Sequence, residues 1–306
     1  MPYFRRDGNR IAYTEHGRGS RVVVLVPGLL FSQRMQEPLA RSLAARGNRV
    51  VTLDPLGHGA SDRPAETWRY SMAEYGREVV ALLDHLDVPE AVIGGASLGA
   101  NTTLEVASIA PERVRGMVIE MPVLEAALLG CAIAFTPLMC ALTFGAPAMR
   151  GLAAVARRAP RSGVPYLGGL LLDWVSQDPA PSAAVLKGLF FGRVAPHRDE
   201  RREFHAPALI IGHRRDPVHP FSDAGLLADE LPDARMLDAD SILELRTRPE
   251  RLTGEIADFV DHCWRPRQRR RAERRSADRR QGASRRGDAK PRAAKPRAAT
   301  RRAASA

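Results

Sequence analysis

The chain has 306 residues, of which 44% are hydrophobic and 26% charged, and its formal net charge is +11. Three cysteines, Cys131, Cys140 and Cys263, are too few and too scattered for a disulfide framework or a zinc site, so we expect a reducing compartment and neither a metal nor a cofactor. The first twenty residues are interrupted by charges and hold no apolar run of signal-peptide length, which predicts a cytoplasmic location.

The positive charge belongs to one end of the chain. Residues 265–306 hold 17 of the 46 basic residues and three of the 35 acidic ones, which leaves 29 basic and 32 acidic residues in 1–264. Because this tail has almost no large apolar side chains, we expect it to be disordered. A solvated tail with only weak affinity for nucleic acid or another polyanion is favoured over a dedicated polyanion-binding segment.

Apolar runs and amphipathic segments alternate along most of the remaining chain. The expected strands are at 3–6, 10–14, 22–26, 49–53, 91–93, 114–119, 208–211 and 234–237. The expected helices are at 35–45, 71–86, 98–110 and 250–263. Strands that alternate with helices predict an α/β fold with a mostly parallel, doubly wound sheet, whose binding sites lie beyond the carboxyl ends of the strands.

Residues 122–200 interrupt this alternation and are predicted to form a helical cap between two parts of the core, 1–121 and 201–264. Residues 126–149 carry no charge and are long enough to span a bilayer. However, the segment contains Gly130, Pro137, Gly145 and Pro147, which are expected to break it into shorter helices. Cap helices are therefore favoured over a membrane span, and no membrane partner is expected.

A short glycine-flanked serine segment carries the strongest functional signal. In Gly95-Ala96-Ser97-Leu98-Gly99, an apolar strand precedes the serine and a helix follows it. A strand that turns at once into a helix leaves little room for side chains, so glycines are needed there and the serine hydroxyl is exposed. The helix that begins at Leu98 directs backbone N–H groups toward any anion that forms beside Ser97. This pattern predicts a nucleophilic serine.

Two further motifs occur in the order found in α/β hydrolases. The strand at 22–26 leads into Pro27-Gly28-Leu29-Leu30, and the strand at 49–53 leads into a loop at 54–62 of the form Asp-x-x-Gly-x-Gly-x-Ser. Together with the elbow at Ser97, they make the chain resemble the α/β hydrolase superfamily. The resemblance implies an oxyanion hole formed by the N–H groups of Leu98 and Leu29, and a cap that favours an apolar acyl substrate.

The acid fits the family pattern, but the base does not. Asp216 follows the strand at 208–211, where the resemblance places the catalytic acid. The family's histidine follows the last strand, but this chain has no histidine between Pro220 and Asp261. His219, three residues after Asp216, is the best substitute as general base, although a surface loop histidine is the commoner role for such a residue. Three other histidines compete less well for this role, namely His213, His58 and His205.

Two functions from different classes remain open on the sequence alone. The first is a serine hydrolase for an ester or similar apolar acyl compound, in which Ser97 attacks and Asp216 and His219 assist. The second is a binding or regulatory module that keeps the pocket without efficient turnover, which the missing loop histidine favours. The intact elbow and oxyanion turn favour the enzyme. A tail that tethers the domain to a polyanion is a weaker third reading.

Overall fold

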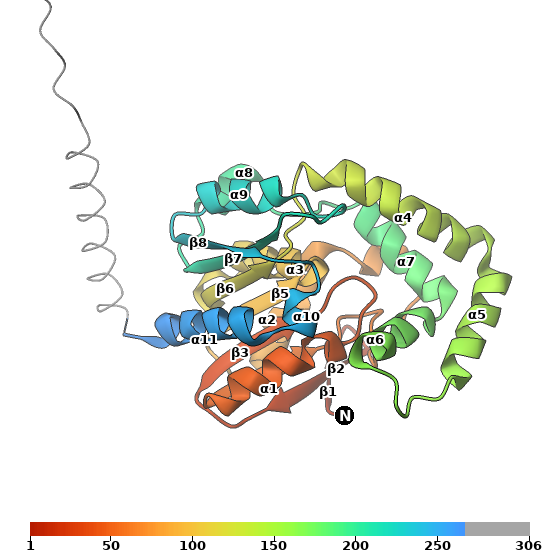
Figure 1. Cartoon of the computed structure of the whole chain (residues 1–306), viewed down its shortest axis with the longest axis horizontal. Coiled ribbons are helices and arrows are strands. Elements are labelled where there is room, and N and C mark those ends of the chain that lie inside the picture. The colour runs from red at the N-terminus through yellow and green to blue at the C-terminus, as the bar shows by residue number, and fades with distance from the viewer. Residues whose placement is uncertain (267–306) are drawn as a thin grey trace, which may run out of the picture. The chain divides into compact units, whose positions relative to one another are not determined.

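The computed structural model describes residues 1–266, and the predictions of a disordered, polyanion-binding tail fall largely on residues 267–306, outside the described part. Residues 1–266 contain one eight-stranded sheet with the order β1-β2-β4-β3-β5-β6-β7-β8 (Figure 1). The strands are β1 (Tyr3–Arg6), β2 (Asn9–His16), β3 (Arg21–Val26), β4 (Asn48–Leu53), β5 (Ala91–Ala96), β6 (Val114–Glu120), β7 (Ala208–His213) and β8 (Ala234–Ala239).

The sheet is parallel apart from its first two strands. β1 and β2 form an antiparallel hairpin, and β2 joins the sheet antiparallel to β4. All other neighbours are parallel, as the alternation of strands and helices predicts. The carboxyl ends of β3 to β8 therefore meet at one edge, where the three sequence motifs come together.

Each face of the sheet has its own hydrophobic core, because successive side chains of a strand point to opposite faces. In β3, Val24 and Val26 belong to a core shared with α2, α3 and α9, whereas Val23 and Leu25 belong to a core shared with α1 and α11. The flanking helices are α1 (Glu37–Ala45), α2 (Met72–His85), α3 (Leu98–Ile109), α9 (Phe221–Glu230) and α11 (Glu250–Trp264), with a short α10 (Glu244–Thr247) before the last. The predicted fold class is confirmed.

Between β6 and β7 the chain forms five helices, and all but the last of them extend to one side of the sheet (Figure 1). They are α4 (Ala127–Phe144), α5 (Ala146–Arg158), α6 (Tyr166–Val175), α7 (Pro179–Phe190) and α8 (Arg198–Arg202). The prediction that Pro137 and Gly130 break the apolar segment is wrong, because α4 is continuous and only Gly145 ends it. Pro137 is exposed, so water can solvate the Ile133 carbonyl that loses its helical donor.

Candidate active site

Ser97 occupies a sharp turn between β5 and α3. Its φ of 53° and ψ of −109° are unusual for a residue other than glycine and are typical of a nucleophile elbow. The flanking glycines are required for space, since a Cβ at Gly95 would lie 2.5 Å from the Val26 carbonyl oxygen and a Cβ at Gly99 would lie 2.2 Å from it. The glycine spacing read from the sequence therefore reflects close packing of the elbow against β3.

The structure brings Ser97, His219 and Asp216 into one hydrogen-bonded chain. The Ser97 Oγ lies 2.8 Å from the His219 Nε2, and the His219 Nδ1 lies 2.8 Å from the Asp216 Oδ2. Ser97 comes from the elbow after β5, whereas the other two residues lie on the loop between β7 and α9. An imidazole that contacts a hydroxyl through one nitrogen and a carboxylate through the other has the arrangement of a general base with its orienting acid.

Asp216 is held rigidly in its charged form. Its Oδ1 accepts hydrogen bonds from the backbone N–H groups of Val218 and His219, at 2.8 and 2.9 Å, and its side chain is only 4% exposed. Burial alone would raise the pKa of the Asp216 carboxyl, but the hydrogen bonds and charge of His219 outweigh it and hold the pKa below its usual value. The carboxylate therefore fixes both the loop and the orientation of the imidazole.

The backbone around the predicted oxyanion hole has free donors. In the part of the chain that the structure describes, neither the Leu29 nor the Leu98 N–H donates a hydrogen bond. Leu98 is the first residue of α3, where helical N–H groups have no partner within the helix. Leu30, next to Leu29, has a φ of 60°, so the turn after β3 is held in an uncommon conformation. Both N–H groups remain available for an anion.

Asp54 connects the loop after β4 to the segment that follows the oxyanion turn. Its carboxylate accepts hydrogen bonds from the Gln33 N–H at 2.6 Å, the Gln33 Nε2 at 3.0 Å and the Ala60 N–H at 2.9 Å. A Cβ at Gly59 would lie 2.1 Å from this carboxyl group, so glycine is needed where the loop turns back. The Asp-x-x-Gly-x-Gly-x-Ser motif thus has a structural role in holding the turn.

The loop after β8, where the sequence lacks the family's histidine, contacts His213 instead. The His213 Nδ1 lies 2.9 Å from the Ser241 carbonyl oxygen, and its Nε2 lies 3.6 Å from the Glu120 carboxylate. Glu120 also pairs with Arg246, and although burial raises its pKa, the charge of Arg246 lowers the pKa to about 2. His213 therefore holds the loop after β8. His205 is exposed on the segment before β7.

His58 is a buried structural residue. Its side chain is fully buried, its Nδ1 lies 3.1 Å from the Leu56 carbonyl oxygen, and its ring packs edge-on against Tyr75. Burial lowers the pKa of this imidazole to about 4. The residue is therefore neutral at physiological pH and has no contact with Ser97.

Acidification should destabilise the protein through His58. In the unfolded chain the His58 imidazole takes up a proton near pH 6.5, but in the folded protein it does so only near pH 4. Between pH 7 and pH 4.5 we expect His58 to remove about 2 kcal/mol of unfolding free energy, which a His58→Gln variant should not lose. Urea denaturation of both proteins at the two pH values measures this difference. Equal losses in both would show that His58 is not the group responsible.

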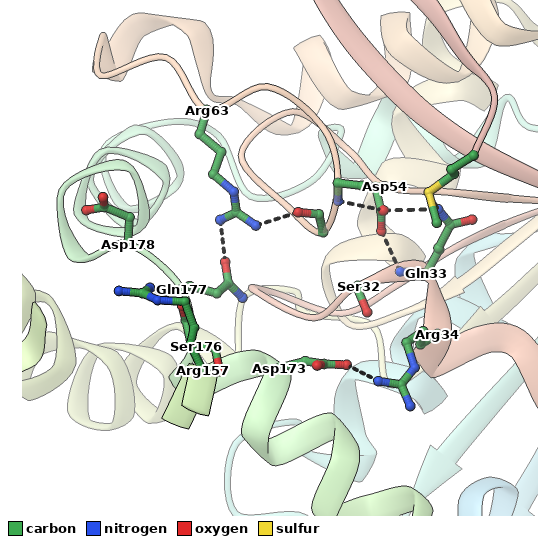
Figure 2. Close-up of a pocket in the computed structure, with 13 residues that line it drawn as sticks. Ser32, Gln33, Arg34, Asp54, Arg63, Arg157, Asp173, Ser176, Gln177 and Asp178 are labelled. Carbon is green, nitrogen blue, oxygen red and sulfur yellow. Dashed lines mark hydrogen bonds and ion pairs between the residues drawn. The ribbon is translucent and has the colours of Figure 1, made fainter. Parts of the chain in front are cut away.

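A cavity of about 490 Å³ lies between the core loops and the cap (Figure 2). Its wall includes Ser32, Arg34 and Arg63, with Asp173 and Gln177 from the cap side. The Arg63 guanidinium donates to the Gln177 side chain at 2.8 Å, and Arg34 pairs with Asp173 at 2.6 Å. Most residues of its wall are polar or charged and it adjoins the segment after the oxyanion turn, but Ser97 does not line it. The Ser97 hydroxyl therefore lies outside this cavity.

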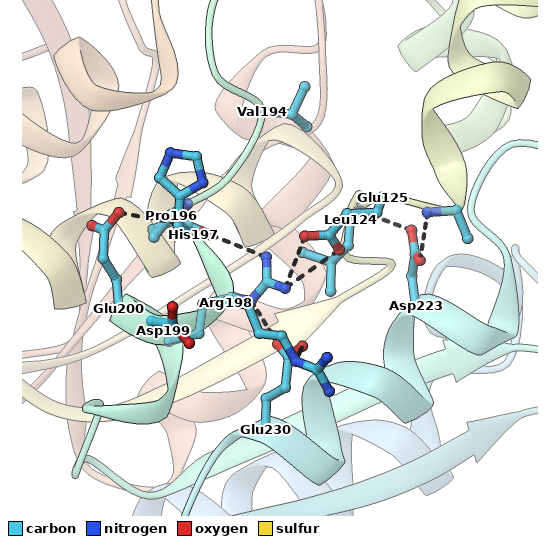
Figure 3. Close-up of polar contacts among 12 residues, drawn as sticks. Leu124, Glu125, Val194, Pro196, His197, Arg198, Asp199, Glu200, Asp223 and Glu230 are labelled. Atoms are coloured by element: carbon cyan, nitrogen blue, oxygen red, sulfur yellow. Dashed lines mark hydrogen bonds and ion pairs between the residues drawn. The ribbon is translucent and has the colours of Figure 1, made fainter.

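Asp223, which the sequence analysis does not identify, fastens the start of the cap to the core. It is fully buried in the first turn of α9 and accepts hydrogen bonds from the N–H groups of Leu124, Ala126 and Ala127, at 2.8, 3.1 and 3.0 Å (Figure 3). The sequence could have indicated it, because an acidic residue three positions after Pro220 is typical of the first turn of a helix. Because α9 directly follows the loop that carries His219, Asp223 anchors the start of the cap next to that loop.

An ion-pair cluster around the buried pair Arg201 and Glu230 strengthens the same junction. The Arg201 guanidinium, on α8, donates to Glu230 of α9 at 2.6 Å and to Glu125 at 3.0 Å (Figure 3). Arg198 also pairs with Glu230, at 3.0 Å. Removing one partner from such a buried group would leave an uncompensated charge, so the cluster acts as a fixed joint between α8, α9 and the beginning of the cap.

Comparison with known proteins agrees with the fold described above. Residues 21–133 match the model of the alpha/beta hydrolase fold family. This matched segment includes the oxyanion turn, the loop at 54–62 and the elbow at Ser97. The chain has the fold of the α/β hydrolases.

Individual relatives in the superfamily match part of the chain. The chain is 38% identical over 104 residues to the dihydrolipoyllysine-residue acetyltransferase component of the acetoin cleaving system of Pseudomonas putida, covering 33% of this chain and 26% of that protein. It is 34% identical over 123 residues to a zearalenone hydrolase of Cladophialophora bantiana, covering 38% of this chain and 45% of the relative. The chain thus spans less than half the length of these two relatives.

Solved α/β hydrolase structures match over a longer stretch. The enol-lactonase of Burkholderia xenovorans LB400 superposes with a TM-score of 0.70 at 22% identity, covering 85% of this chain and 100% of the enzyme. At this level of identity the similarity establishes the fold. The activity has to be argued from the residues of the site.

Proposed function

We propose that the protein is a serine hydrolase that cleaves an ester, a lactone or a similar acyl compound. The observation that carries this proposal is the continuous contact from the Ser97 Oγ through the His219 imidazole to the Asp216 carboxylate, with 2.8 Å at each step. A serine hydroxyl is a weak nucleophile near neutral pH unless a base removes its proton. In this arrangement His219 is that base, and Asp216 fixes the tautomer with the proton on Nδ1.

The proposed reaction has two halves. The Ser97 Oγ attacks the acyl carbon while its proton moves to the His219 Nε2, and the N–H groups of Leu29 and Leu98 stabilise the oxyanion that forms. The imidazolium then returns the proton to the leaving alkoxide, which leaves an acyl ester on Ser97. Water attacks this ester with His219 again as base, and the acid product departs as Ser97 recovers its proton.

Apolar side chains beside the oxyanion turn support an apolar acyl group as substrate. Leu29 packs against a cluster of cap residues formed by Leu142, Ala183 and Leu186. These cap residues are themselves buried, but the apolar surroundings they give the oxyanion turn favour a hydrocarbon group over a charged acyl group.

A fluorophosphonate probe tests this proposal, because it reacts with activated serines whatever their natural substrate. We expect the probe to label the wild-type protein at Ser97 and to leave a Ser97→Ala variant unlabelled. Peptide fragmentation should separate Ser97 from Ser108, which lies on the same helix–turn segment and accompanies it in a tryptic peptide. A folded wild-type protein that stays unlabelled would favour the binding module over the enzyme.

A further inference from the structure

The outer side of the cap is apolar and has no protein partner among the described residues. Leu129, Ile133 and Phe144 on α4 are 72, 68 and 84% exposed. Their positions fall within one side of the helix, because they are spaced by whole turns or nearly so. The helix meets the length and hydropathy expected of a membrane-spanning segment, yet only 11% of it is buried within the protein. A contiguous exposed surface of this kind marks an interaction site.

The same surface continues onto α5 and carries only positive charge. Val155 and Leu152 are exposed on α5, at 69 and 49%. Residues 126–172 contain no aspartate or glutamate, and Arg150 and Arg158 of α5 are exposed. Arg157 lines the cavity of Figure 2, and Arg161 pairs with Asp173 at 2.5 Å. We call this apolar, arginine-flanked surface of α4 and α5 the outer cap face. Its chemistry fits a surface that is apolar inside and negatively charged at its border.

The opposite side of α4 is fastened to the protein. Near its start, Gly130 packs closely against the loop that carries His219. A Cβ at Gly130 would lie 3.3 Å from the Pro217 carbonyl oxygen. Near its end, Leu142 is buried with Ala183 and Leu186 of α7. A helix held at both ends along the protein surface can lie in the plane of a membrane interface, but it cannot cross the bilayer without leaving these contacts.

We propose that the outer cap face docks on the surface of a bilayer that contains anionic phospholipid, with α4 lying in the interface. The exposed leucine, isoleucine and phenylalanine side chains enter the acyl region, and the arginines contact the lipid phosphates. A second copy of the chain fits this face less well, because a two-fold dimer through it would bring Arg150 and Arg158 of both copies together, and residues 126–172 offer no carboxylate between them. The proposal does not depend on the hydrolase activity.

Vesicle flotation of the full chain tests this proposal. We expect binding to vesicles of phosphatidylcholine mixed with phosphatidylglycerol and weaker binding to phosphatidylcholine alone. A double Leu129→Gln, Ile133→Gln variant should lower the partition coefficient at least about tenfold. Ile109→Gln is the matched control, since Ile109 is also exposed but ends α3 at the opposite edge of the sheet, and it should bind like the wild type.

Two outcomes would overturn the proposal. If the double variant binds the mixed vesicles as well as the wild type, the basic residues 265–306 account for the binding and the outer cap face does not. If light scattering finds a wild-type dimer that the double variant abolishes, and the vesicles capture neither protein, the face is a contact between two copies. Thermal melting of both variants shows that they remain folded.

Discussion

Replacement of His219 by alanine should lower kcat/KM for a p-nitrophenyl ester by at least about 10⁴-fold, as happens in serine hydrolases that lose their general base. The Ser97 Oγ has no other imidazole contact among the described residues, so its proton would have no acceptor. The loss should fall on kcat, because His219 acts on the transition state rather than on substrate binding.

His205→Ala is the control for this result. His205 is an exposed histidine before β7, and its loss should leave the activity unchanged. Circular dichroism and thermal melting should show that both variants are folded. A His219→Ala variant that keeps more than about a tenth of the wild-type kcat/KM would mean that another group activates Ser97.

Conversion of Asp216 to asparagine should lower kcat by about 10³- to 10⁴-fold with little change in shape. In the wild type, the Asp216 Oδ1 accepts the two loop N–H groups and the Oδ2 accepts the proton on the His219 Nδ1. An asparagine that keeps the loop bonds through its oxygen must present its amide group to the Nδ1. The imidazole would then carry its proton on the Nε2 and could not accept one from Ser97.

The matched control is Asp240→Asn, on the exposed loop after β8 where the family's histidine usually lies. It should retain wild-type kcat, because the charge removed has no contact with the site. If both variants lose the same activity, the effect of Asp216→Asn reflects the general loss of negative charge near the sheet edge rather than control of the imidazole.

The orientation of His219, the proposed base, is set by a short local turn in this protein. Asp216 and His219 are three residues apart, and the Asp216 side chain caps the N–H groups of the turn between them. Pro217 and Pro220 restrict the backbone inside and at the end of this turn. The acid and the base therefore reach Ser97 as one preorganised unit, without a contribution from the loop after β8.

The strands, the flanking helices and the elbow could be predicted from the sequence, because each depends on local pattern. A strand such as β3 is an apolar run with turn residues after it, and the glycines around Ser97 reflect close packing. The spacing of Asp216 and His219 is equally local. For this reason both residues could be proposed from the sequence.

The contact between His219 and Ser97 could not be derived in the same way. The two residues are 122 positions apart, and their distance depends on how the β7 loop and the elbow approach each other at the sheet edge. Asp223 was missed because its role is to accept hydrogen bonds from three backbone N–H groups of a segment far away in the sequence. The prediction of a helix break at Pro137 was wrong, because helix propensity does not account for water that solvates the carbonyl freed by an exposed proline.

The central claim is that His219 activates Ser97, and the rate of fluorophosphonate labelling tests it without knowledge of the natural substrate. We expect the second-order rate constant for labelling at Ser97 to fall at least about 100-fold in a folded His219→Ala variant, since the hydroxyl loses its base. Labelling of Ser97 at the wild-type rate in that variant would contradict the claim.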